Sequence, residues 1–332
     1  MLQAQAMSMT YEEFSSDLPR HGTLGFTSAE QTEAVFKSHG VDQPMRQLAR
    51  GRYRADLAVR STEQADLFAD RYNVACSIYL EPPAGAVALL FFRSAGGRFL
   101  ASGESVANDK LVVLPRGSGS DLVAPDLFGS DAMTVPEARF IELTELLCAT
   151  PKSVRPERVA VIQGDTGQLQ ALRRTLLELL AHPELDRNQE RVSNLLAATI
   201  DSMGRYSGFW RPERLANGAR SRVARLAREF IEEHYREAVR LEDLCRASGV
   251  GVRTLQRCFR EYFDLTITEY LKTVRLDAAH RELAAADPVR ESVSAIAVQH
   301  GFSHLGRFSV EFRERFGESP RETLAARATS SP

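Results

Sequence analysis

The chain has 332 residues, 43% hydrophobic and 26% charged, which is typical of a globular protein large enough for two domains. Its longest apolar run, Ala86 to Phe92, is too short to span a bilayer, and no basic start precedes an apolar stretch at the N-terminus. We therefore expect neither a membrane span nor a secretory signal. Four scattered cysteines (Cys76, Cys148, Cys245, Cys258) lack the spacing of metal ligands and indicate free thiols in a reducing compartment, the cytoplasm.

The net charge of −2 is unevenly distributed along the chain. Residues 1–204 carry 20 basic against 26 acidic side chains, whereas residues 205–332 carry 22 against 18. Arg205 to Arg228 contains seven arginines and one acid, and Leu244 to Arg260 contains four arginines and none. The basic C-terminal part is compatible with a nucleic-acid partner, although a solvated basic face is the simpler alternative.

Residues 50 to 125 have the pattern of short β-strands. The segments RYRADLAVR, YNVACSIYL, AVALLFF and KLVVL are rich in strand-forming residues, and turn signals such as Pro82-Pro83 and Gly96-Gly97 separate them. This spacing predicts a small β-barrel or jelly roll, similar to a cupin, within a first domain over residues 1–204.

Two helices are expected after the strands. Leucines 169, 172, 176 and 179 form one narrow seam, and a second stretch places Val192, Leu195, Leu196, Thr199 and Met203 on one face. Such seams pack within the chain or form a dimer contact, and the sequence leaves both open. Residues 205–221, which include Trp210, are rich in Gly, Pro and Arg and are predicted to be a linker.

The region after the linker predicts a helix-turn-helix unit. A helix with Val223, Leu226, Phe230 and Ile231 inward is followed by a short helix at 241–247 and a break at Ser248-Gly249-Val250. The next helix places Leu255, Cys258, Phe259 and Phe263 inward. Its outer face then carries arginine, threonine and glutamine side chains, as in DNA-reading helices.

The same pattern returns near the C-terminus. A long helix begins at the capping box of Thr266 and Glu269 and ends at Asp287-Pro288. Beyond it, Val293, Ile296 and Ala297 predict a short buried helix, Gly301 a turn, and Ser303 the cap of a helix with Phe308, Phe312 and Phe316 inward. His300 and His304 are four residues apart, but the turn separates them, so we expect no metal site.

Residues 222–325 resemble the DNA-binding domain of AraC/XylS-type transcription regulators. The segment AIAVQHGFSHLGRFSVEFRERFGESPRE matches the family signature Ala-x-x-x-Gly-Phe…Phe-Ser-x-x-Phe…Phe-Gly-x-Ser-Pro at many fixed positions. The resemblance implies an all-α domain with two helix-turn-helix units, whose recognition helices enter successive major grooves about 34 Å apart. Overall we expect an α+β protein, with a β-rich N-terminal domain and dimerisation helices before this all-α domain.

The resemblance also implies the DNA-contacting residues. In the first unit they are Arg253, Thr254, Gln256, Arg257 and Arg260, and in the second they are His304, Leu305, Arg307 and Ser309. The chain departs from the family where Val310 replaces an arginine, Gly306 a polar residue, and Thr266-Ile267 a Ser-Pro pair. The second unit is therefore expected to contribute more to positioning than to base reading.

The N-terminal domain is similar to the β-rich domains of AraC-like regulators of the ethanolamine-regulator type. This resemblance implies that residues 1–204 form a sensor or dimerisation domain. A cupin enzyme is the alternative, but no histidine lies between His39 and His182 to hold a metal. No nucleophile or phosphate-loop motif is present, so we expect no enzyme activity, catalytic residue or cofactor. Polar candidates for a ligand site (Arg52, Arg54, Glu104, Asp109, Arg116) are read as surface positions.

These observations favour a ligand-responsive transcriptional activator, with double-stranded DNA, RNA polymerase and a second copy of the chain as partners and a small-molecule effector possible. One alternative is a regulator controlled by its abundance alone. The other is an interaction protein that has lost DNA binding, which Val310 and the weak net basicity suggest.

Overall fold

The computed structural model describes residues 9–19, 22–41, 43–106, 110–115, 117–148, 159–163, 165–182, 188–205 and 218–326. The chain divides into two compact units, Met1–Met45 with Arg54–Leu215, and Arg46–Tyr53 with Ala216–Pro332. Asp109, Arg116, Trp210 and most of the predicted linker lie outside the described residues. The linker and its boundaries therefore stay a prediction.

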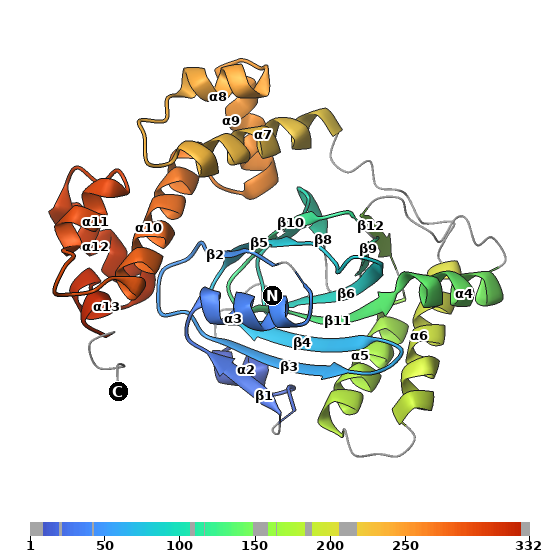
Figure 1. Ribbon diagram of the computed structural model, residues 1–332. Coiled ribbons are helices and arrows are strands. Elements are labelled where there is room, and N and C mark those ends of the chain that lie inside the picture. Colours follow the sequence, from blue (N-terminus) through green and yellow to red (C-terminus); the bar gives the residue numbers. More distant parts are fainter. Residues whose placement is uncertain are drawn as a thin grey trace. The chain divides into compact units, whose positions relative to one another are not determined.

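The first unit contains two β-sheets (Figure 1). One has seven antiparallel strands in the order β1-β3-β4-β11-β6-β9-β12, and the other has five in the order β2-β5-β10-β7-β8. The strands of the first are β1 Thr23–Phe26, β3 Ala55–Ser61, β4 Asp66–Tyr72, β11 Phe128–Pro136, β6 Ala86–Ser94, β9 Lys110–Leu114 and β12 Ala160–Gln163. Those of the second are β2 Met45–Gln47, β5 Cys76–Leu80, β10 Ser120–Ala124, β7 Phe99–Ala101 and β8 Glu104–Val106.

The predicted β-rich domain is thus confirmed, although the described strands form two sheets and not one closed barrel. The central strands β6 and β11 explain the two-layered arrangement, because their residues are buried along almost their whole length on both faces of the sheet. A sheet that is apolar on both faces needs two covers. One face meets the five-stranded sheet across a cavity, and helices cover the other.

Helices α4 (Glu137–Leu147), α5 (Thr166–Ala181) and α6 (Asn188–Arg205) pack together, and α5 lies on β3, β4, β9 and β11. Short helices α2 (Tyr11–Ser15) and α3 (Ala29–Ser38) complete the unit. The two predicted leucine-rich seams are buried in the core with strands β6 and β11, so packing within the chain accounts for them. They are not free to form the dimer contact that was the other interpretation.

The second unit contains seven helices within residues 218–326, all of them described. They are α7 Gly218–His234, α8 Leu241–Ser248, α9 Val252–Phe263, α10 Ile267–Ala285, α11 Val293–Gln299, α12 Leu305–Phe316 and α13 Pro320–Ala326. Figure 1 shows α7–α9 at one end of the long helix α10 and α11–α13 at the other. The predicted pair of helical units joined by one long helix is confirmed.

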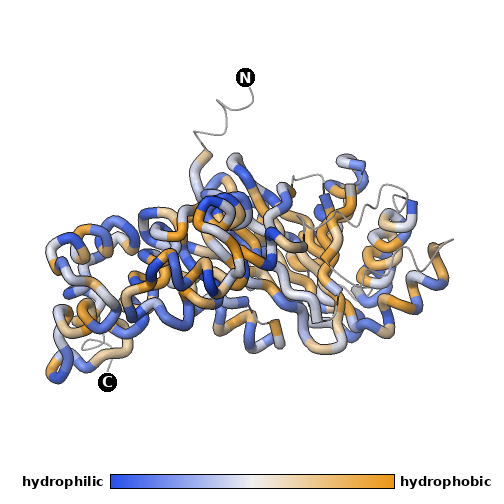
Figure 2. Tube along the Cα trace, turned by 90° about the horizontal axis from the view of Figure 1, so that it is seen from above, coloured by the Kyte–Doolittle hydropathy of each residue, from blue (hydrophilic) through white to orange (hydrophobic). Residues whose placement is uncertain are grey.

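Local sequence explains where these helices begin and end. The predicted capping box of α10 is present, since the Thr266 hydroxyl accepts from the Glu269 N–H while the Glu269 carboxylate accepts from the Thr266 N–H. Several helices in Figure 2 alternate orange hydrophobic and blue hydrophilic residues along their turns, as expected where one side packs and the other is exposed. Among the described residues, no helix is long and apolar enough to cross a bilayer.

Candidate nucleic-acid interface

The first helix-turn-helix unit consists of α8 and α9, which pack against α7. Gly249 ends α8 with φ of 71°, a left-handed conformation that glycine adopts without the Cβ penalty. Gly251 then precedes α9, whose buried residues are Leu255, Cys258, Phe259, Tyr262 and Phe263. The rings of Phe259 and Phe263 lie 4.7 Å apart and fix the inner face of the helix.

The predicted contact residues of α9 lie on its opposite, exposed face: Arg253, Thr254, Gln256, Arg257 and Arg260. None of Arg253, Gln256 and Arg257 forms an ion pair or side-chain hydrogen bond with another described residue. Their donors are therefore available to a partner. Arginine and glutamine at such positions can form two hydrogen bonds with the major-groove edges of guanine and adenine.

The second unit consists of α11, a turn at Gly301 (φ 80°), and α12. Phe308 and Phe312 are buried and Phe316 packs against them, as the Phe spacing predicts. The prediction that Ser303 caps α12 is wrong, because the helix begins one residue later, with His304 as N-cap and no side-chain cap bond. The Ser292 hydroxyl caps α11 instead, accepting from the Ala295 N–H.

The predicted contact residues of α12 (His304, Leu305, Arg307, Ser309) are also exposed, but their polar groups are partly used within the helix. The Arg307 guanidinium lies 3.0 Å from the Glu311 carboxylate, and the Ser309 hydroxyl donates to the Leu305 carbonyl. Val310 is 58% exposed on the same helix. This face offers fewer free donors than α9 and more apolar surface, which suits contact with a thymine methyl group.

Polar side-chain contacts join α10 to α12 and to α7. The Arg315 guanidinium of α12 lies 3.2 Å from the Asp277 carboxylate, with both side chains less than a tenth exposed. At the other end, the Tyr270 hydroxyl of α10 donates to Glu232 of α7 at 2.8 Å. Arg315 was not singled out in the sequence, although it lies three residues after Phe312 and so falls on the inner face.

His300 and His304 lie in different environments, as expected from the turn that separates them. His300 is 1% exposed, and its Nε2 lies 2.7 Å from the Glu282 carboxylate. Burial lowers the pKa of His300, and the Glu282 carboxylate opposes this shift. His304 is exposed at the start of α12, so the two rings belong to different environments.

The recognition helices α9 and α12 have no side-chain cap at their N-termini, as is also true of α8. Neither Gly251 nor His304 caps its helix through a side chain, whereas Thr266 and Ser292 cap α10 and α11. The first-turn N–H groups of α9 and α12 are therefore not taken up by a cap, and such groups suit DNA phosphates.

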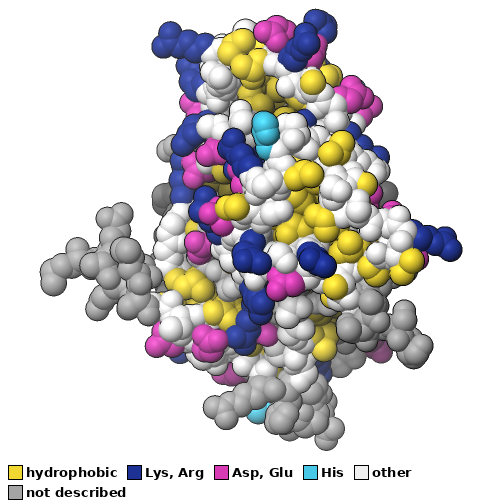
Figure 3. All heavy atoms as spheres, turned by 90° about the vertical axis from the view of Figure 1, so that its left-hand side faces the viewer, with side chains coloured by type: hydrophobic (Ala, Val, Ile, Leu, Met, Phe, Trp, Pro, Cys, Tyr) yellow, Lys and Arg dark blue, Asp and Glu magenta, His cyan; other side chains and the backbone are white. Residues whose placement is uncertain are grey.

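Surface charge is mixed in this protein. On the face shown in Figure 3, dark-blue Lys and Arg side chains are interspersed with magenta Asp and Glu side chains. Since the net charge is −2, attraction to DNA depends on local arginines such as those of α9 and not on a general basic field.

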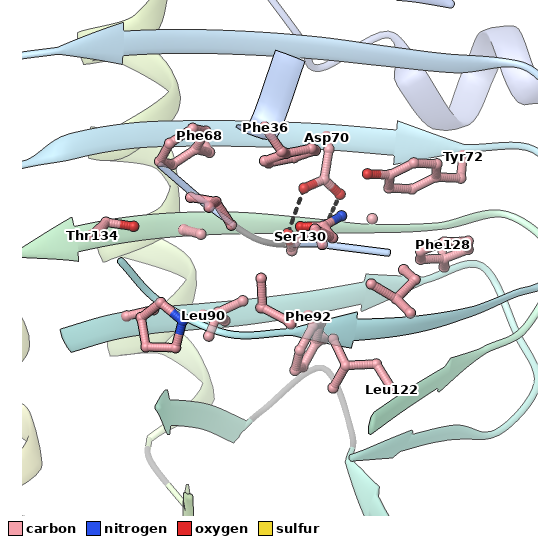
Figure 4. Close-up of a pocket in the computed structure, with 18 of the residues that line it drawn as sticks. Phe36, Phe68, Asp70, Tyr72, Leu90, Phe92, Leu122, Phe128, Ser130 and Thr134 are labelled. Carbon is pink, nitrogen blue, oxygen red and sulfur yellow. Dashed lines mark hydrogen bonds between the residues drawn. The ribbon is translucent and has the colours of Figure 1, made fainter. Parts of the chain in front are cut away.

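The first unit contains a cavity between its two sheets, shown in Figure 4. Its walls are largely aromatic and aliphatic, and its polar side chains are Gln43, Asp70, Tyr72, Ser130 and Thr134. None of the described candidates for a ligand site (Arg52, Arg54 and Glu104) lines it. No sequence pattern marks Asp70, because its environment depends on pairing with a strand 60 residues away.

Comparison with known proteins identifies the second unit. A family model described as a helix-turn-helix domain matches residues 244–326. The probable thc operon regulatory protein of Rhodococcus erythropolis is 38% identical over 102 residues, which are 31% of this chain and 31% of that protein. The XylDLEGF operon transcriptional activator 2 of Pseudomonas putida is 31% identical over 97 residues, which are 29% of this chain and 62% of that protein.

Among solved structures, a probable AraC family transcriptional regulator from Rhodopseudomonas palustris has 32% sequence identity to this chain. The match covers 31% of this chain and 95% of that chain, with a TM-score of 0.30. The chain spans less than two thirds of the length of both curated relatives. The likeness thus lies in a segment of about a hundred residues that carries both helix-turn-helix units. Residues 244–326 match a helix-turn-helix domain, and the region that contains them is similar to segments of known operon regulators.

Proposed function

We propose that this protein is a sequence-specific DNA-binding regulator of transcription. The observation that carries the proposal is the pair of exposed recognition helices, α9 and α12, at opposite ends of α10. At 1.5 Å per residue, the 19 residues of α10 give a helix about 28 Å long. This length suits two helices that enter successive major grooves on one face of DNA, about 34 Å apart.

The two helices have different roles in this proposal. On α9, Arg253 and Arg257 bond guanine and Gln256 bonds adenine, while Thr254 and Arg260 contact neighbouring bases or phosphates. On α12, His304, Leu305, Arg307 and Ser309 make the contacts. Because the polar groups of Arg307 and Ser309 are engaged within the helix, α12 contributes more to positioning than to base reading.

We also propose that a small molecule controls DNA binding, which the cavity of the first unit supports. A ligand acts on such a regulator by binding one arrangement of the protein more tightly than another. Action as an activator on RNA polymerase, a homodimeric state and a cytoplasmic location belong to the same proposal. A regulator controlled by its abundance alone is the alternative, and it predicts that no ligand changes DNA affinity.

The test is selection of bound fragments from the source genome with purified full-length protein at physiological salt. Wild type is compared with Arg257→Ala and with Arg139→Ala, a surface arginine of α4 in the other unit. We expect wild type and the α4 control to enrich the same few sites, each with two half-sites about one helical turn apart, and Arg257→Ala to lose them. Absence of enrichment by wild type at low salt would instead support an interaction protein without DNA binding.

A further inference from the structure

The two faces of β4 carry side chains that lie in different environments. Side chains alternate across a strand, so Phe68, Asp70 and Tyr72 face the cavity. Arg71 points to the other face, where its guanidinium bonds Asp17 and Asp131. The buried guanidinium is thus matched by carboxylates on its own side of the sheet, and Asp70 is left on the cavity side.

Asp70 is a buried carboxylate without an ion pair to any described residue. It is 5% exposed, and its two oxygens accept from the N–H and the hydroxyl of Ser130 on β11, at 2.8 and 2.7 Å (Figure 4). Among the described residues, no lysine, arginine or histidine lines the cavity. A carboxylate in this position has accepting capacity beyond the two bonds to Ser130.

Aromatic rings surround this carboxylate. Tyr72 stacks on Phe128 with ring centres 4.4 Å apart, Phe92 stacks on Phe99 at 4.1 Å, and Phe36 lies 5.7 Å from Phe68. All six rings line the cavity. The faces of aromatic rings are negative and attract cations, and their carbon surface accepts an alkyl chain.

We propose that the cavity binds a small organic ammonium compound, with its ammonium group on the Asp70 carboxylate and its alkyl part against the aromatic rings. The proposal rests on the ligand-responsive part of the proposed function and names the chemical class of the ligand. An anion is excluded because it would face the Asp70 carboxylate with no cation in the cavity wall to offset the repulsion. A neutral alcohol can donate one hydrogen bond to the Asp70 carboxylate, but it carries no positive charge to attract that carboxylate.

The ligand must also be small. The cavity has a volume of about 40 Å³. Burial raises the pKa of Asp70 to about 6, against the opposing effects of Ser130 and Arg71, so the carboxylate is largely ionised at neutral pH. A bound ammonium group would offset the loss of hydration that the buried Asp70 carboxylate has suffered.

The test is calorimetric titration of the full-length protein with primary alkylamines of increasing chain length, each beside the alcohol and the carboxylic acid of the same length. We expect the best amine to bind about tenfold or more tightly than its alcohol, as for a hydrogen bond to a charged group, and the acids not to bind. Alcohol binding as tight as amine binding, or no amine binding at millimolar concentration, would overturn the proposal.

Two variants assign the effect to the carboxylate. Asp70→Asn keeps the shape and removes the charge, so it should abolish the preference for amine over alcohol. Asp126→Asn, which removes a carboxylate outside the cavity lining, should keep that preference. Thermal unfolding shows whether both variants fold. A preference that persists in folded Asp70→Asn would show that the amine binds elsewhere.

Direct binding separates this inference from the proposed function, because the titration requires no DNA. Amine binding without any change in DNA affinity would support the inference and contradict ligand control of DNA binding. A change in DNA affinity on addition of alcohols or acids, without amine binding, would contradict the inference and leave ligand control in place.

Discussion

Replacing Asp70 by asparagine should increase the stability of the protein relative to wild type as the pH rises from about 4 to about 6. Desolvation raises the pKa of this carboxyl to about 6 in the folded chain, whereas an aspartate in an unfolded chain has a pKa of about 3.9. Ionisation is therefore harder in the folded state. Between these two values the folded state retains a proton that the unfolded state has lost, so stability falls as pH rises through this window.

The size of the effect follows from the difference of about two pKa units. Each unit corresponds to about 1.4 kcal/mol, so the ionised carboxylate costs about 3 kcal/mol of unfolding free energy above about pH 6 and nothing below about pH 4. Asparagine does not ionise. The stability of Asp70→Asn relative to wild type should therefore increase by up to about 3 kcal/mol between these limits, whatever constant difference the lost hydrogen-bond geometry adds.

The assay is urea denaturation of wild type and variant across about pH 4 to 8, followed by circular dichroism. All other carboxyls are common to both proteins, so their contributions cancel in the difference between them. Thr134→Val, which removes no titrating group, should differ from wild type by the same amount at every pH. If Asp70→Asn shows the same flat difference, or gains stability toward low pH, the reasoning about the buried carboxylate is wrong.

Three further outcomes are expected. Arg257→Ala should weaken specific DNA binding by about 1–3 kcal/mol and relax preference at one base pair. By contrast, replacing the exposed Arg225 of α7 by alanine should weaken binding to all sequences about equally and lower the salt slope by about 1. Both effects are measured by titration with labelled duplexes. Phe312→Ala should cost about 3–5 kcal/mol of unfolding free energy, because this ring is 0% exposed in the core of the second unit, while exposed Val310→Ala should change it by less than about 0.5 kcal/mol. Gly129→Ala should destabilise the first unit by about 1–3 kcal/mol or more in urea denaturation, because a Cβ there would lie 2.1 Å from a carbonyl oxygen of β4; equal stability would show that the strands separate without cost.

The second unit was predicted well because its signals are local. A capping box, a glycine at a left-handed turn and inward residues at helical spacing each act within a few positions of the chain. The exposed positions of Arg253 and Arg257 follow from the same spacing, since the inward positions of this helix are those of Leu255, Cys258 and Phe259. The prediction that failed here, a cap at Ser303, concerned a helix end, where a shift of one residue changes the cap.

The first unit was predicted only as β-rich, because strand order and the use of each face depend on distant residues. From the sequence, the leucine seams of α5 and α6 were compatible with packing inside the chain or with a dimer contact. The structure shows that they pack into the core of the first unit, against the sheet. Likewise, the bond from Ser130 to Asp70 exists because β11 pairs with β4, across 60 residues of sequence.

The sequence by itself determined the two helix-turn-helix units, the helix that joins them and the residues on their outer faces, because helical periodicity and turn chemistry are properties of neighbouring residues. Only the tertiary structure decided which charged side chains form ion pairs. It places Arg71 beside Asp17 and Asp131 on one face of β4 and leaves Asp70 among aromatic rings on the other. That distinction requires the sheet to be assembled, since adjacent residues on a strand enter different environments that distant strands and helices supply.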